Sequence, residues 1–335
     1  MLLPRRCAAL CLPALLAFPA AAEAQPFKDR VISGALAHAA QVKGTTQSYP
    51  AADGTMIPVT LASSYTGDPA VAQTYATFLG TLPHGSELAS LKVTVVPSSE
   101  IAGDCGGSPS DGILACYGSD DQTMIVPGDQ PADSTVSVNY VIAHEYGHHI
   151  ALHRSNAPLE ALDYGPKRWA SYELVCANTI DGKLAPGDEG TNYLSNPGEA
   201  WAEAYARLVF PLEAWRFTPL LKPTQGSALA AAADVAQPWA KRVSTTFTGT
   251  NTHTFKLPIT LDGAFTLQLD GPAKANYDLV VRSGGKTFEK TTRTDSRDRI
   301  NYPIACRDRR TETLRITVLK RSGSGPYTLT AKYAG

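Results

Sequence analysis

The sequence has little charge and almost no excess of either sign. Only 18% of its 335 residues are charged, and 30 basic against 31 acidic side chains leave a net charge of −1. A general nucleic-acid binder is therefore not expected, because such proteins attract phosphates with a basic surface. With 43% hydrophobic residues, the composition also excludes a disordered, collagen-like or coiled-coil chain. A globular protein of about two domains is expected from the length.

Long apolar runs are missing beyond the N-terminus. No later run approaches 18 apolar residues, so we expect no transmembrane segment. The first stretch is typical of a secretory signal, with a basic start at Arg5 and Arg6, a short apolar run over 8–22, and small residues ending at Ala24. Residues 1–24 are therefore predicted to be a signal peptide, and the mature chain is expected to be secreted or periplasmic.

Cysteine is scarce, and outside the predicted signal four remain: Cys105, Cys116, Cys176 and Cys306. In an oxidising compartment they permit three disulfide pairings. The Gly-, Ser- and Pro-rich segment between Cys105 and Cys116 favours a local bridge, and Cys176–Cys306 would then join two distant regions. A cysteine-rich metal site is the alternative, but no Cys-x-x-Cys spacing is present.

The pattern of apolar residues predicts two domains. Residues 25–243 indicate a mixed α+β domain, and residues 244–335 alternate with period two between Gly-rich turns, as in a small β-sandwich. The predicted helices cover 26–43, 66–82, 136–153, 167–179 and 197–210, and the predicted strands cover Leu91–Val96, Ile113–Tyr117 and Thr123–Val126. Residues 245–335 hold 15 basic and 8 acidic side chains. This positive tail could dock on the first domain or on an anionic envelope surface, although a solvated basic face is the simpler interpretation.

The most informative motif is His144-Glu145-Tyr146-Gly147-His148, within the predicted helix 136–153. Helical residues four apart project about 40° from each other, so both imidazoles can meet one cation. Zinc bound there lowers the pKa of a coordinated water, and Glu145 can take the proton of that water and pass it to a leaving amine. The motif thus predicts one catalytic Zn²⁺ with His144 and His148 as ligands and Glu145 as general base. A core helix with coincidental histidines is the alternative.

A catalytic zinc site needs a third protein ligand, for which Glu199 is the best candidate. Glu203 lies four residues later on the same helical face, so one carboxylate could bind the metal while the other hydrogen-bonds a ligand histidine. Asn196 as N-cap and Pro197 at the first helical position would also make Glu199 part of an ordinary helix start. Asp163 is a competing ligand.

A third histidine ligand is not indicated. Ala151 and Arg154 stand where the metzincin motif has its glycine and histidine. His149 and His153 are expected to be surface or packing residues, because they point to other sides of the helix.

The two motifs together resemble the gluzincin clan of zinc metallopeptidases. The pattern of His144–His148 with downstream Glu199-Ala200-Trp201-Ala202-Glu203 is similar to that of small bacterial members and of the anthrax lethal factor catalytic domain, where a Glu-x-x-Ala-Glu helix supplies the third ligand. The resemblance implies a zincin-like fold with His144, His148 and Glu199 as ligands, Glu145 as base and Glu203 behind the ligands. It further implies that the hairpin at 113–126 includes the edge strand along which a peptide lies. Tyr193 is the candidate for stabilising the oxyanion, with Tyr205 as the alternative.

The C-terminal region resembles the bacterial pre-peptidase C-terminal domain in the segments 277–281 and 323–329. The expected function is an exported zinc endopeptidase that acts on a protein or peptide substrate. The alternatives are an envelope or matrix binding protein with a structural zinc site, and a zinc hydrolase acting on another substrate. A structural site would show four protein ligands, whereas an enzyme keeps one position open.

Overall fold

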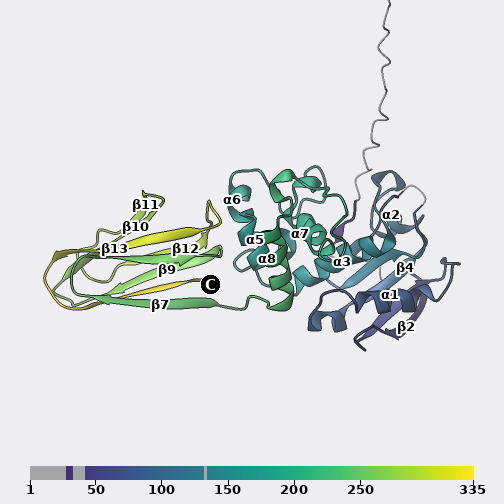
Figure 1. Cartoon of the computed structure of the whole chain (residues 1–335), viewed down its shortest axis with the longest axis horizontal. Helices are drawn as coiled ribbons and strands as arrows, with labels where there is room; N and C mark the ends of the chain where they lie inside the picture. Colours follow the sequence, from purple (N-terminus) through teal and green to yellow (C-terminus); the bar gives the residue numbers. More distant parts are fainter. Residues whose placement is uncertain (1–27, 33–41, 132–133) are drawn as a thin grey trace, which may run out of the picture.

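The computed structural model (Figure 1) describes residues 28–32, 42–131 and 134–335. The predicted signal peptide and most of the predicted helix 26–43 lie outside these residues. The chain combines a region of sheet and helices with a C-terminal region made only of strands, an α+β layout. Within the described part of the chain, no helix is both long and apolar enough to cross a membrane.

A mixed six-stranded sheet lies at one end of the molecule, in the order β1-β5-β6-β4-β3-β2. Its strands are β1 (Val31–Ile32), β2 (Gly44–Pro50), β3 (Met56–Ala62), β4 (Lys92–Val96), β5 (Cys116–Gly118) and β6 (Thr123–Pro127). The strands β3, β4 and β6 are parallel, β5 returns antiparallel to β6, and β1 runs parallel to β5. The edge next to β5 is therefore occupied by a segment from the start of the described chain.

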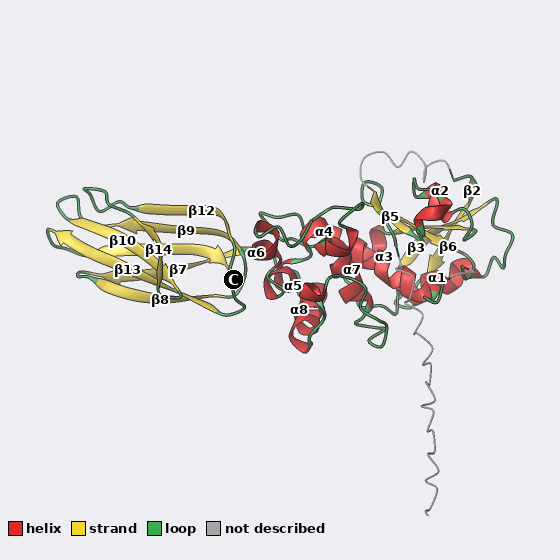
Figure 2. Ribbon diagram, turned by 90° about the horizontal axis from the view of Figure 1, so that it is seen from above, coloured by secondary structure: helices red, strands yellow, loops and turns green. Residues whose placement is uncertain are grey.

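Helices cover the sheet and fill the middle of the molecule (Figures 1 and 2). They are α1 (Val71–Leu79), α2 (Ile101–Asp104), α3 (Val138–Leu152), α4 (Ala161–Tyr164), α5 (Lys167–Tyr172), α6 (Val175–Ile180), α7 (Pro197–Ala206) and α8 (Gln225–Ala236). Short 3₁₀ helices cover Ser86–Ser90, Pro109–Asp111, Tyr193–Ser195 and Pro219–Leu221. α1 and α3 share one apolar core with the sheet, whereas α2 contributes to a smaller core that contains Cys105 and Cys116. The pair α3 and α7 packs at the centre of the helical layer.

Most predicted elements form, with two corrections. The predicted helix 26–43 is wrong for residues 28–32, which are extended and pair with β5. The predicted helix 167–179 is broken into α5 and α6, because Leu174 has a φ of 56° and a helix needs negative φ. The predicted strands near 91–96 and 113–126 are present, and the period-two pattern of the C-terminal region does form strands.

The C-terminal region consists of two four-stranded antiparallel sheets around one apolar core. Its strands are β7 (Arg242–Gly249), β8 (His253–Ile259), β9 (Gly263–Asp270), β10 (Asn276–Ser283), β11 (Lys286–Lys290), β12 (Arg299–Ala305), β13 (Glu312–Ser322) and β14 (Tyr327–Ala334). One sheet has the order β11-β10-β13-β8 and the other β12-β9-β14-β7. Alternate residues such as Leu267 and Leu269 on β9 are fully buried, which is the burial that the alternation predicts.

Both favoured disulfides are present. Cys105–Cys116 closes a local loop, with Cα atoms 5.8 Å apart, and Cys176–Cys306 joins α6 to the segment after β12. Such bridges fit an oxidising, extracytoplasmic compartment. The junction between the regions is also held by hydrogen bonds, including one of 3.0 Å from Lys167 Nζ to the carbonyl of Asp262.

Candidate metal centre

The helix α3 carries both motif histidines inside the protein. Its start is capped by Ser137, whose side chain accepts a hydrogen bond from the Tyr140 N–H, and residues 140–151 are all buried. A surface helix exposes one face. Because α3 lies between the sheet and α7, its polar residues His144, Glu145 and His148 are buried with no exposed surface.

The helix α7 brings Glu199 to α3. Asn196 caps α7 by accepting a hydrogen bond from the Gly198 N–H, and Pro197 opens the helix, as the sequence predicts. Gly147 allows the two helices to approach, since a Cβ on it would lie 2.8 Å from Ala202 Cα. The Trp201 indole N–H donates to the Gly147 carbonyl at 2.9 Å. The glycine of the motif thus sets the distance between the histidines and Glu199.

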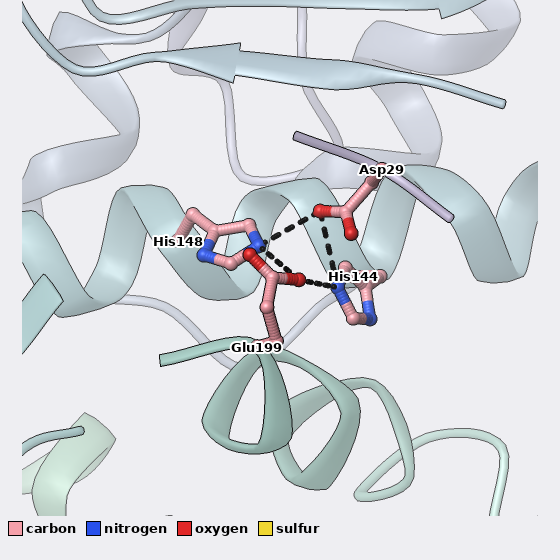
Figure 3. Close-up of side chains that lie close together, drawn as sticks. All are labelled: Asp29, His144, His148 and Glu199. Atoms are coloured by element: carbon pink, nitrogen blue, oxygen red, sulfur yellow. Dashed lines mark hydrogen bonds and ion pairs between the residues drawn. The ribbon is translucent and has the colours of Figure 1, made fainter. Parts of the chain in front are cut away.

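A fourth side chain, Asp29, completes the group (Figure 3). It belongs to the extended segment that precedes β1. Asp29 Oδ2 lies 3.0 Å from His148 Nε2 and 3.3 Å from His144 Nε2. Glu199 Oε2 lies 3.3 Å from His144 Nε2 and 3.5 Å from His148 Nε2. All four side chains are buried, so this is a group that could hold a metal ion.

The spacing of the four donor atoms is compatible with a single small metal ion such as zinc. Zinc bonds to imidazole nitrogen and carboxylate oxygen are about 2.1 Å long, which puts neighbouring donors of a tetrahedron roughly 3.4 Å apart. The four separations between a histidine nitrogen and a carboxylate oxygen span 3.0 to 3.5 Å, and all four donor atoms lie within 4.8 Å of one another. Two neutral imidazoles and two carboxylates are also a donor set that zinc accepts. The residues therefore fit the metal that the motif predicts.

The charges of the group are strongly coupled. Burial lowers the pKa of His148, but the negative charge of Glu199 and the hydrogen bond with Asp29 outweigh burial and raise this pKa to about 10. Burial would raise the pKa of Asp29, yet His144 and His148 hold it well below its usual range. Without metal, protonated histidines therefore balance the negative charge of the carboxylates, and a bound cation would displace the histidine protons.

Glu145 is the most unusual of these residues. Neither of its carboxylate oxygens has a hydrogen-bond partner among the described residues, although the side chain is completely buried. Burial and the negative charge of Asp29 raise its pKa well above that of an ordinary carboxyl group. A buried, unpaired carboxyl group destabilises a fold, so its place beside the four donors calls for a functional reason.

The structure brings Tyr193 and Glu203 to the group as well. The Tyr193 hydroxyl donates to Asp29 Oδ1. Glu203 Oε2 lies 3.5 Å from His144 Nδ1, and its other oxygen accepts from Arg216 at 3.0 Å. Both side chains therefore contact members of the four-residue group, Tyr193 through Asp29 and Glu203 through His144.

The competing candidates lie elsewhere. Asp163 is in α4 and is not a member of the four-residue group. The Tyr205 hydroxyl donates to the Pro83 carbonyl at 2.7 Å. His149 is a buried packing residue that contacts the Tyr117 hydroxyl and the Glu87 carbonyl, each at 2.8 Å. Burial lowers its pKa to about 4, so it stays neutral.

Two residues of the site were not predicted from the sequence. Asp29 stands in a segment whose apolar spacing suggests a helix, and a lone aspartate carries no signal of its own. Glu189, in the loop before α7, accepts hydrogen bonds from the Val31 N–H at 3.3 Å and from the Asn196 side chain at 3.0 Å. Burial and the negative charges of Glu199 and Asp29 raise its pKa to about 10. The sequence signal for Glu189 is its position ten residues before Glu199, in the loop that leads to α7.

No protein-family model matches the chain, and no curated protein matches it in sequence. The assignment of a function therefore depends on the motifs and on the geometry of the site.

Proposed function

We propose that this protein is an exported zinc endopeptidase. The observation that carries the proposal is a buried donor group, in which His144, His148 and Glu199 come from two packed helices, with Glu145 in the same turn of α3. The buried carboxylate of Glu145 has no hydrogen-bond partner among the described residues. A purely structural site has no use for Glu145. A hydrolase needs such a carboxylate within reach of a water.

Each residue near the donor group has its own role in the proposed reaction. His144, His148 and Glu199 would hold the ion, and Glu203 with Arg216 would keep His144 in orientation. A bound zinc ion supplies a Lewis acid that acidifies water and polarises a carbonyl. Glu145 accepts the proton of the attacking water and delivers it to the leaving amine. The Tyr193 hydroxyl donates a hydrogen bond to the carbonyl oxygen as negative charge develops there.

A second function, a binding protein with a structural zinc, has one observation in its favour. Asp29 adds a fourth protein donor, and structural zinc sites are closed by four protein ligands. The two functions differ in their use of Glu145. A hydrolase needs its carboxylate as a proton acceptor, whereas a structural site does not.

The test is hydrolysis of unfolded casein by the mature protein and by its Glu145→Gln variant at equal zinc content. Because Asp29 is one of the four donors, the Asp29→Asn substitution is also combined with each of the two proteins, and hydrolysis is measured again. Glutamine keeps the shape of Glu145 but cannot accept a proton, so we expect activity to fall by about 10²- to 10⁴-fold. Glu100→Gln, at an exposed glutamate, is the matched control. Equal activity with and without Glu145 would overturn the mechanism. Full zinc occupancy without cleavage by any form would favour the structural site.

A further inference from the structure

The segment 28–32 lies in the place where an extended peptide would bind. It covers the edge of β5, where backbone N–H groups within and beside the strand donate to the carbonyls of the segment. Leu114 donates to Lys28 at 2.9 Å, and Tyr117 and Ser119 donate to Arg30 and Ile32 at 3.0 Å each. Main-chain bonds of this kind are how a sheet edge binds a peptide of varied sequence.

The opposite side of the segment is also held. The Asp29 N–H donates to the Tyr193 hydroxyl at 3.3 Å, and the Val31 N–H donates to Glu189 Oε2 at 3.3 Å. The Arg30 guanidinium donates to the Gly106 carbonyl at 3.0 Å, within the loop closed by the Cys105–Cys116 bridge. The segment is thus fixed between β5 on one side and the residues before α7 on the other.

The carboxylate of Asp29 occupies the two places that a substrate carbonyl would need, the metal position and the Tyr193 hydroxyl. Its Oδ2 lies among the donor atoms of His144 and His148, and its Oδ1 accepts from Tyr193. A side-chain carboxylate has no peptide bond to be cleaved. The segment therefore fills the site without being a substrate at that position.

We infer that residues 28–32 are an internal inhibitor, in which Asp29 takes the fourth position on the metal and engages Tyr193 until the segment leaves the edge of β5. The inference rests on the proposed function. It explains why a site with four protein donors can belong to an enzyme, which needs one open position on its metal. The chain is a closed form of a peptidase, and its open form has three protein ligands and a free sheet edge.

The experiment measures access to the metal separately from catalysis. Metal-free full-length mature protein is loaded with Co²⁺ and titrated with acetohydroxamate, and binding is followed by the visible absorption of the cobalt. The variants are Asp29→Ala and Asp29→Asn, which keeps the volume of the side chain and serves if the alanine variant does not fold. Asp181→Asn, at an exposed aspartate paired with Lys183, is the matched control. Casein hydrolysis by the zinc forms is measured in parallel.

We expect both Asp29 variants to bind acetohydroxamate at least about tenfold more tightly than the wild type and the control, because apparent affinity is proportional to the fraction of molecules whose metal position is open. Casein hydrolysis should rise by a similar factor. Equal hydroxamate affinity in all proteins would overturn the inference, as would a wild type that cleaves casein as fast as the Asp29 variants. Tighter hydroxamate binding without cleavage by any form would keep Asp29 in the fourth position and contradict the peptidase.

Discussion

The helical region and the C-terminal sheets bury charge in different ways. Around α3 and α7, charged side chains lie at the centre of the structure, and Glu145 there has no hydrogen-bond partner among the described residues. In the C-terminal region, buried Asp262 pairs with Arg307 and buried Asp278 with Arg321. Buried Asp298 there accepts a hydrogen bond from the Thr291 hydroxyl. Burying a charge destabilises a fold unless the charge is compensated. A buried carboxylate with an arginine or hydroxyl partner therefore indicates structure, whereas one without any hydrogen-bond partner indicates a site.

Removal of a disulfide is expected to change the free energy of unfolding more than any other substitution below. Replacing Cys176 and Cys306 by alanine removes a link that spans 130 residues, and we expect the free energy of unfolding to fall by about 5 kcal/mol. The matched pair, Cys105 and Cys116, is only 11 residues apart, and its removal should cost about 3 kcal/mol. Denaturant unfolding of the oxidised proteins measures both. A smaller loss for the long link than for the short one would show that the two regions unfold independently.

The next test concerns the contact between α3 and α7. In Gly147→Ala, the new Cβ would meet the backbone of Ala202 at 2.8 Å, so α7 has to move. We expect a loss of about 1–3 kcal/mol in stability. Zinc affinity, measured by chelator competition, should fall about tenfold because Glu199 moves with α7. Gly103→Ala is the control, since its Cβ in α2 would meet no atom within 4 Å. Unchanged zinc affinity in Gly147→Ala would mean that this helix contact does not position Glu199.

The smallest effect is a pH dependence at the junction of the two regions. Burial lowers the pKa of Lys167 to about 8, although Asp262 and Asp234 oppose the shift. Between this value and the ordinary lysine pKa, the unfolded chain binds more protons than the folded chain, so stability rises with pH. From pH 8 to 9 the wild type should gain about 1 kcal/mol relative to Lys167→Met.

The measurement is denaturant unfolding of both proteins at pH 8 and pH 9. Lys183→Met, at an exposed lysine, should retain the gain seen in the wild type. A gain of equal size in Lys167→Met would assign the pH dependence to other groups.

Much of the central site is predictable because its signals are local. The spacing of His144 and His148 places both imidazoles on one face wherever a helix forms. Asn196 and Pro197 mark the start of α7, and the structure begins the helix at Pro197. The alternation in the C-terminal region likewise depends only on neighbouring residues. In each case a few residues along the chain carry enough information to specify the local backbone.

Other parts of the fold carry weaker signals. Apolar spacing in 26–43 suggests a helix, but residues 28–32 pair with β5, because the hydrogen bonds of a sheet edge outweigh a weak helical preference. The break at Leu174 follows no glycine or proline, so sequence offers no reason to end α5 there. The hairpin of β2 and β3 and the helix α8 were not predicted, and each is stabilised by packing against neighbours distant in sequence.

Local sequence patterns specify His144 and His148, Glu145 between them and the start of the helix that bears Glu199, because each depends on the geometry of one helix. The place of Asp29 beside them, 119 residues before His148, follows from the three-dimensional fold alone. Its position depends on pairing between a short extended segment and the edge of β5, and such pairing depends on long-range contacts that leave no period in the sequence.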